Sequence, residues 1–260
     1  MVRRIAHDAG EMILTHYDPS GCAHDIKDDG SPVTPADQEA EVYIEKALRE
    51  ILPDIPVVAE EAISAGKVMD TQIHPYFWLV DPLDGTREFV KGGEDFTVNI
   101  ALIHQGTPVL GVIYAPALGE MFAGYGAGTA IRWNRETDTE KNIRVRKPPS
   151  AGLTVAISRF EGARPKLDQF LESLKVEKLV RRGSSLKICL VAMGKADLYP
   201  RFGRTCEWDT AAGDIILRSA GGTLTDMFGK ALAYGGGGTW ENPGFLAHAG
   251  VLDFTEALIP

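Results

Sequence analysis

Cysteine is scarce in this chain of 260 residues, which contains only Cys22, Cys189 and Cys206. Their number is odd and none forms a CxxC pair, which argues against a disulfide framework or a zinc site and predicts reduced thiols. Long apolar runs are also missing, since no stretch approaches the ~20 residues that span a bilayer. Residues 1–16 contain no uninterrupted apolar stretch of the signal-peptide kind. The sequence therefore predicts a cytoplasmic protein without an integral membrane segment.

Positive charge is in the minority. The 27 Lys and Arg residues are outnumbered by 36 Asp and Glu residues, and the formal net charge is -9 at pH 7. This balance opposes general attraction to nucleic acid or to anionic membranes, so no nucleic-acid partner is expected. An anionic small-molecule substrate would need local cations. Hydrophobic residues at 44% and charged residues at 24% are otherwise typical of a soluble globular protein.

The pattern of apolar residues predicts a mixed α+β protein. Helices are expected at 3–17 and 35–50, because Thr34 offers a cap for the second helix, with proline and an acid in its first turn. The expected strands of the first half are short apolar runs at 57–58, 77–80, 98–103 and 109–114.

A run with paired prolines at 147–152 predicts a boundary between an N-terminal half, 1–147, and a C-terminal half, 148–260. The elements expected after it alternate between strand and helix: strand 153–158, helix 165–174, helix 185–194, strand 197–201 and helix 209–219. Such alternation favours stacked layers, and the predicted architecture is a layered αβαβα sandwich.

The segment 78–86 contains the most chemical information, because an apolar strand leads directly into a turn that bears Asp81 and Asp84. Two carboxylates three residues apart across a proline-stiffened turn can point into one site, where they would repel each other unless a cation lay between them. Hard oxygen ligands favour magnesium or manganese. The backbone amides around Gly85 and Thr86 would suit a phosphate group. Taken alone, the segment is equally compatible with a solvated turn.

Two further acidic segments favour the cation. Glu60 and Glu61 follow the strand at 57–58, and Glu207 and Asp209 stand at the start of an expected helix. Closely spaced carboxylates are tolerated when a metal neutralises them, and two metals about 3.5–4 Å apart stabilise both the attacking and the leaving oxygen. The three segments together predict a metal-dependent site.

Two of these segments carry a family resemblance. Asp81-Pro82-Leu83-Asp84-Gly85-Thr86 and Trp208-Asp209-Thr210-Ala211-Ala212-Gly213 resemble the two signatures of the inositol monophosphatase superfamily. Within it the chain is most similar to the bacterial CysQ-type 3'(2'),5'-bisphosphate nucleotidases, on the stretches 27–37, 183–187, 195–203 and 207–209. The resemblance implies a sandwich of the inositol monophosphatase type and a phosphoric monoester hydrolase. Its substrate would be 3'-phosphoadenosine 5'-phosphate, hydrolysed to AMP and phosphate in sulfur metabolism.

The resemblance also implies a ligand set for two or three Mg²⁺ ions in each active site. The implied ligands are carboxylates and one backbone carbonyl: Glu60, Asp81, Leu83, Asp84 and Asp209. Glu60, Asp81 and the carbonyl of Leu83 would hold one ion. Asp81 would bridge to a second ion, held also by Asp84 and Asp209. Inhibition by lithium is implied as well.

The nucleophile implied by the resemblance is a metal-bound water that Thr86 and Asp37 activate, in agreement with a lowered water pKa beside a base. The implied substrate-binding residues combine the metal site with a recognition group: Glu60, Leu83, Asp84, Gly85, Thr86, Ser184, Lys187, Arg201 and Asp209. Ser184, Lys187 and Arg201 would approach the base or the phosphate that is not cleaved, whose charge needs a cation. Solvated surface cations are the alternative for Lys187 and Arg201.

One loop departs from the family pattern. Relatives often have a Ser-Arg-Ser-His sequence where this chain has Ser158-Arg159-Phe160-Glu161-Gly162. The change affects the expected nucleoside specificity and leaves the metal chemistry untouched. Two other functions stay open, an inositol or sugar monophosphatase of the same superfamily and a noncatalytic nucleotide sensor. A sensor needs no water-activating pair, so Asp37 and Thr86 argue against it. The resemblance is also compatible with a homodimer and with peripheral association with the inner membrane.

Overall fold

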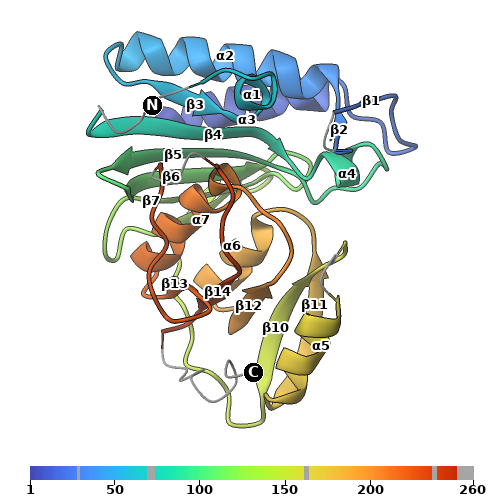
Figure 1. The fold of residues 1–260 in the computed structure, drawn as a ribbon, viewed down its shortest axis with the longest axis vertical. Helices are drawn as coiled ribbons and strands as arrows, with labels where there is room; N and C mark the ends of the chain where they lie inside the picture. The colour runs from blue at the N-terminus through green and yellow to red at the C-terminus, as the bar shows by residue number, and fades with distance from the viewer. Residues whose placement is uncertain (28–29, 69–73, 161–163, 236–238, 251–260) are drawn as a thin grey trace.

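Five layers of secondary structure are stacked in the computed structural model, which describes residues 1–27, 30–68, 74–160, 164–235 and 239–250 (Figure 1). Helices α1 (Val2–Leu14) and α2 (Pro35–Ile51) cover one face of a seven-stranded sheet. Helices α6 (Leu186–Ala192) and α7 (Glu207–Ser219) lie between this sheet and a five-stranded sheet, whose outer face carries α5 (Arg164–Glu172). The predicted αβαβα sandwich is confirmed.

The seven-stranded sheet comes entirely from the first half of the chain. Its strands follow in sequence order as β3 (Val57–Ala59), β4 (Tyr76–Asp84), β5 (Thr97–His104), β6 (Thr107–Ala115), β7 (Glu120–Gly124), β8 (Ile131–Asn134) and β9 (Thr139–Asn142). All neighbours are antiparallel except β3 and β4, which run parallel with Ala59 opposite Val80. Because the two strands run in the same direction, the residue that follows β3 lies beside the last residues of β4.

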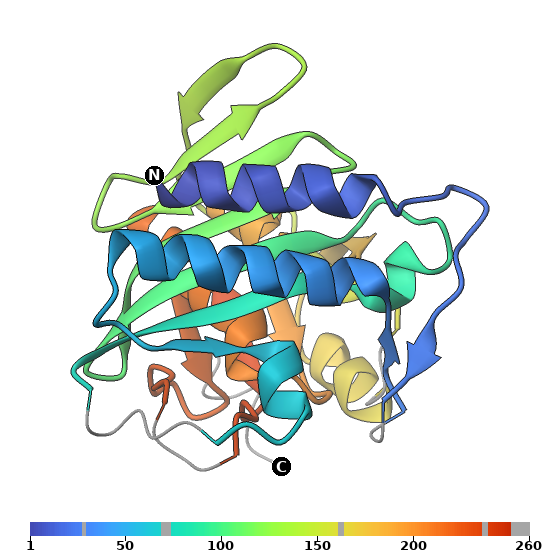
Figure 2. The same cartoon turned by 90° about the horizontal axis from the view of Figure 1, so that it is seen from above.

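The five-stranded sheet comes from the second half. Its strands, in spatial order, are β11 (Val176–Arg182), β10 (Leu153–Ser158), β12 (Leu198–Arg201), β14 (Phe245–His248) and β13 (Thr223–Asp226). The short elements of the first half are a hairpin and two single turns: β1 (Asp25–Ile26), β2 (Pro32–Val33), α3 (Glu60–Ser64) and α4 (Thr86–Phe89). Figure 2 shows α1 and α2 side by side above the large sheet, with the hairpin of β8 and β9 extending beyond them.

The central core joins the two sheets through α6 and α7. Phe77 from the large sheet and Phe245 from the small sheet belong to one cluster of buried residues, together with Trp208 of α7. Helix α7 lies very close to β6, since a Cβ atom added at Gly111 would lie 2.5 Å from the carbonyl oxygen of Ala212. The small residues Gly111 of β6 and Ala212 of α7 therefore allow the helix to pack tightly against the large sheet. This packing brings the N-terminal end of α7 near the end of β4.

Most expected elements are present with shifted ends. Helix α1 ends at Leu14 rather than at residue 17, and α7 begins at Glu207, two residues before the expected start. The structure adds strands that the apolar pattern did not indicate: β7, β8, β9, β11, β13 and β14. The division at residue 147 stays a prediction. Within the described ranges, every helix is too short or too polar to cross a bilayer.

Candidate active site

A cavity of about 790 Å³ is lined by residues of both halves of the chain. Nearly all the site residues predicted from the sequence line it: Glu60, Asp81, Leu83, Asp84, Gly85, Thr86, Ser184, Lys187, Arg201 and Asp209. Asp37 lies behind Thr86 and contacts its hydroxyl group. The fold thus brings together residues that are up to 172 positions apart in the sequence, from Asp37 to Asp209.

Three aspartates form the acidic end of the cavity. One carboxylate oxygen each from Asp81, Asp84 and Asp209 lies within 4.8 Å of the others. Burial, and then the negative charges of Glu60, Asp84 and Asp209, raise the pKa of Asp81 well above its ordinary value. Burial and the charges of Asp84 and Glu60 raise the pKa of Asp209 to about 8. Buried carboxylates that repel each other at this separation suit a hard divalent cation such as Mg²⁺.

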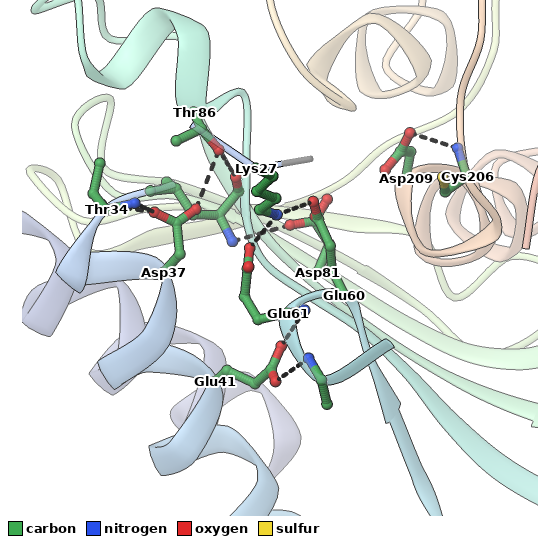
Figure 3. A network of polar contacts seen from close by, with 12 residues as sticks. Lys27, Thr34, Asp37, Glu41, Glu60, Glu61, Asp81, Thr86, Cys206 and Asp209 are labelled. Carbon is green, nitrogen blue, oxygen red and sulfur yellow. Dashed lines mark hydrogen bonds and ion pairs between the residues drawn. The ribbon is translucent and has the colours of Figure 1, made fainter. Parts of the chain in front are cut away.

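The parallel pairing of β3 and β4 places a fourth carboxylate beside this group. Ala59, the last residue of β3, pairs with Val80, so Glu60 at the start of α3 follows beside Asp81 of β4. The carboxylate of Glu60 accepts a hydrogen bond from Lys27 Nζ at 2.8 Å, and Lys27 also bonds Glu61 at 2.6 Å (Figure 3). Lys27 therefore neutralises part of the negative charge of the site.

A local irregularity at the end of β4 aims Asp81 and Asp84 into the cavity. Asp81 pairs with Asn99 and Asp84 with Thr97, and the register shifts between these two pairs. The backbone N–H of Leu83 donates to Asp81 Oδ1 at 3.0 Å, and the N–H of Ser185 donates to Asp84 Oδ2 at 2.5 Å. These N–H groups fix the direction of each carboxylate at the cavity wall.

Gly85 follows directly and permits the turn into α4. Its φ of 95° lies in the left-handed region, where side chains are strained. A Cβ atom there would also lie 2.9 Å from the carbonyl oxygen of Asp95. The turn places Thr86 at the start of α4, facing the cavity.

Thr86 and Asp37 form a hydrogen-bonded pair. The Thr86 hydroxyl lies 3.1 Å from Asp37 Oδ1 and 3.1 Å from the carbonyl oxygen of Leu83 (Figure 3). The other carboxylate oxygen of Asp37 accepts hydrogen bonds from the N–H and the hydroxyl of Thr34, at 2.7 and 2.6 Å. Burial raises the pKa of Asp37 even though these hydrogen bonds oppose the shift. The pair is held rigidly and can exchange a proton.

The cationic side of the cavity comes from the second half of the chain. Lys187 is buried on α6, where its Nζ donates to the carbonyl oxygen of Ser184 at 2.6 Å and lies 5.1 Å from the centre of the Tyr199 ring. Its charge opposes the rise in the pKa of Asp84. Arg201 donates to the carbonyl oxygen of Arg204 at 3.0 Å. Both cations line the cavity, and their contact with substrate stays a prediction.

Sequence reasoning did not assign roles to several residues that shape this site. Lys27 stood in a family stretch without a role, and Glu41 was not singled out within the helix predicted at 35–50. Phe160 of the divergent loop lines the cavity, whereas Glu161 and Gly162 lie outside the described residues.

Comparison with known proteins agrees with this geometry. The model of the inositol monophosphatase family matches residues 2–258. The chain belongs to the inositol monophosphatase family. A curated 3'(2'),5'-bisphosphate nucleotidase CysQ from Salmonella typhimurium is 46% identical over 247 residues, which cover 94% of this chain and 96% of that protein.

Solved structures of the inositol monophosphatase family superpose on the whole chain. The crystal structure of CysQ from Bacteroides thetaiotaomicron gives a TM-score of 0.78 at 34% identity and covers 96% of both chains. An IMPase from Thermotoga maritima gives 0.77 at 25% identity, over 98% of this chain and 92% of that one. The protein is thus an enzyme of a phosphatase family, with a carboxylate cluster suited to the metal on which such chemistry depends.

Proposed function

We propose that this protein is a magnesium-dependent 3'(2'),5'-bisphosphate nucleotidase that hydrolyses the 3'-phosphate of 3'-phosphoadenosine 5'-phosphate to give AMP and phosphate. The proposal rests on one observation: the cluster of Asp81, Asp84 and Asp209 lines the same cavity as Thr86. The names of the curated relatives at 44–46% identity over 94% of the chain support the choice of substrate. The cytoplasmic location and a homodimer stay predictions.

The proposed metal ligands are the three clustered aspartates and Glu60, completed by the carbonyl oxygen of Leu83. When bound, Mg²⁺ would lower the pKa of a water molecule and offset the negative charge on the phosphoryl oxygens. The protein's own contribution is a set of carboxylates whose directions are fixed by backbone N–H groups, as those of Leu83 and Ser185 show.

The proposed proton path runs from water through Thr86 to Asp37. A hydroxyl group that donates its single proton keeps lone pairs that can accept another, so Thr86 can orient a water molecule in the cavity. As this water adds to phosphorus and the ester P–O bond breaks, Thr86 takes the water's proton and passes its own to Asp37 Oδ1, which is 3.1 Å away. The departing 3'-oxygen takes up a proton from solvent and becomes the hydroxyl group of AMP. The raised pKa of Asp37 makes it a better proton acceptor than an exposed aspartate.

Recognition of the second phosphate is proposed for Ser184, Lys187 and Arg201, which line the same cavity from the turn before α6, from α6 and from β12. The positive charges would meet the 5'-phosphate, while the acidic end meets the phosphate that is cleaved.

The test is release of phosphate from a panel of substrates by the purified protein. We expect rapid, Mg²⁺-dependent hydrolysis of 3'-phosphoadenosine 5'-phosphate, slower hydrolysis of inositol 1-phosphate, and no turnover in EDTA. Faster hydrolysis of inositol 1-phosphate would instead make the protein an inositol monophosphatase. Tight nucleotide binding without release of phosphate would make it a sensor.

A further inference from the structure

Glu41 is a buried carboxylate that the proposed chemistry does not use. It lies on α2, where only 7% of its surface is exposed. Its Oε2 accepts a hydrogen bond from the backbone N–H of Glu61 and its Oε1 accepts one from the N–H of Ala62, both at 2.8 Å (Figure 3). Both carboxylate oxygens are therefore directed at the first turn of α3.

These two bonds supply a cap that α3 lacks in its own sequence. The first N–H groups of a helix have no partner inside the helix, and Ala59, at the cap position, has no side-chain acceptor. Glu41 replaces that acceptor from a neighbouring helix. With five residues, α3 is too short to be stable through its own hydrogen bonds, so its orientation depends on such outside contacts.

The turn that Glu41 holds begins with Glu60 and continues with Glu61. Glu60 is the proposed metal ligand of this turn, and Lys27 bonds both carboxylates. When a cation takes the Glu60 carboxylate, Lys27 keeps a partner in Glu61, which lies 2.6 Å away. Glu41 therefore fixes the backbone of Glu60, the proposed cation ligand, and of Glu61, which keeps the contact with Lys27.

Helix α2 connects this anchor to the proton-accepting pair. Asp37 and Glu41 are four residues apart, so they lie on the same face of α2, one turn from each other. Asp37 contacts Thr86 at the start of α4, and Glu41 contacts the start of α3. A single rigid helix thus sets the separation between the residue that orients water and the carboxylate that holds a cation.

We propose that Glu41 is a positioning residue, which sets the affinity of the site for a divalent cation by orienting Glu60. The proposal rests on the proposed function in one respect, the role of Glu60 as a ligand. A merely structural cap would change the stability of the fold and leave cation affinity unchanged. The two roles therefore separate in a measurement of cation binding.

The test compares Glu41→Gln with the wild-type protein by Mg²⁺ titration, followed both as the rise in unfolding temperature and as the activation constant for phosphate release. Glutamine keeps one acceptor oxygen and turns a donor toward the second N–H, so one of the two bonds is lost. We expect Mg²⁺ affinity to fall roughly 10- to 100-fold, as for other residues that orient metal ligands. Turnover at saturating Mg²⁺ should stay close to the wild-type value.

Glu45→Gln is the matched control. Glu45 lies one turn further along α2, and its carboxylate bonds the side chains of Arg49 and Lys67 rather than the N–H groups of the first turn of α3. We expect this variant to keep the wild-type Mg²⁺ affinity. An equal loss in both variants would show a general effect of the helix and would overturn the proposal.

A double variant shows whether Glu41 acts through Glu60. In a Glu60→Gln background, Glu41→Gln should weaken Mg²⁺ binding far less than it does alone, because the ligand it orients is already lost. Full additivity would overturn the proposal. Glu41→Asp, which keeps the charge but is one methylene shorter, serves as a second single variant if the glutamine variant does not fold, and it should lose affinity in the same way.

The measurements distinguish a wrong proposed function from a wrong role for Glu41. A wild-type protein that shows no thermal response to Mg²⁺ and no Mg²⁺-dependent turnover would remove the function and the inference together. A wild-type protein that responds, beside Glu41→Gln and Glu41→Asp variants with unchanged affinity, would remove the inference alone.

Discussion

Asp37 and Asp209 occupy the same local position in two different helices. Each is the third residue of its helix, and each accepts a hydrogen bond from the backbone N–H of the cap residue, Thr34 at 2.7 Å and Cys206 at 2.8 Å. Asp37 is otherwise surrounded by the hydroxyl donors of Thr34 and Thr86. Asp209 faces the carboxylates of the acidic cluster.

The two surroundings create different chemistry from the same motif. Hydroxyl donors prepare Asp37 to exchange a proton with Thr86, whereas neighbouring negative charge and burial raise the pKa of Asp209 to about 8 and prepare it for a cation. Helix capping thus places a carboxylate, and its tertiary neighbours decide what the carboxylate does.

The largest effect is expected for Asp209→Asn. Loss of a direct metal ligand should reduce turnover to an undetectable level, beyond the roughly 100-fold typical of residues that only orient ligands. Asparagine can still accept the N–H of Cys206 and is neutral in both the folded and the unfolded state. The metal-free variant therefore avoids the cost of holding a proton on Asp209 among other carboxylates, and it should unfold at a higher temperature than metal-free wild type. Calorimetry in EDTA checks this sign, and a lower unfolding temperature would contradict the proposed repulsion.

Asp37→Asn should have the opposite effect on stability. The amide keeps the shape but places a donor where a carboxylate oxygen accepts, so a hydrogen bond from Thr34 or Thr86 is lost. This loss should cost the metal-free variant about 1 kcal/mol of stability. Turnover should fall roughly 10²- to 10⁴-fold because the proton acceptor is lost, with little change in Mg²⁺ affinity. Stabilisation of this variant in EDTA would show that the two aspartates do not differ as described.

Arg201→Ala and Lys187→Ala should leave both aspartates intact and act mainly on recognition, although Lys187→Ala also removes a positive charge that acts on Asp84. A charge-assisted hydrogen bond contributes about 1.5–3 kcal/mol, so kcat/KM for the bisphosphate nucleotide should fall roughly tenfold to hundredfold for each. Adenosine 3'-monophosphate lacks the remote phosphate, and its hydrolysis should change only a few-fold. Equal losses of kcat/KM with both substrates would show that these cations act on the reaction at the aspartate cluster and not on recognition of the second phosphate.

The smallest effect concerns the pH dependence of stability in the metal-free protein. With a folded-state pKa of about 8, Asp209 keeps its proton when folded and loses it on unfolding at any pH between its ordinary pKa near 4 and about 8. The folded state therefore binds more protons between about pH 4 and pH 8, and stability falls as pH rises through this window.

In EDTA, the unfolding temperature should accordingly be a few degrees lower near pH 8 than near pH 5. Saturating Mg²⁺ should remove most of this difference, because the cation replaces the protons. Asp209→Asn should have a flatter pH profile than wild type, whereas Asp37→Asn should keep most of the slope. A steep profile in Asp209→Asn would place the titrating groups elsewhere.

Local sequence predicted the parts of the site that local structure creates. Asp81 and Asp84 follow an apolar strand and share a tight turn, so their convergence depends on only a few residues. The start of α2 was likewise predictable, since Thr34, Pro35 and Asp37 are the residues that begin helices. Two of the missed strands lack an apolar signal: β9 is exposed throughout as Thr-Glu-Lys-Asn, and β11 is mostly exposed. Strands β7 and β14 are largely buried, but their apolar runs are only a few residues long.

The sequence by itself determined the chemical types, namely the aspartates, the Thr86 hydroxyl and the cations, together with the turns and helix starts that present them. Only the tertiary structure decided which of them meet. The parallel pairing of β3 with β4 sets Glu60 beside Asp81, the close packing of α7 on β6 brings Asp209 to the same cavity, and Glu41 reaches the first turn of α3 from another helix. Each of these contacts depends on burial of apolar faces between layers far apart in the chain, and no short-range pattern reports the register in which those faces pack.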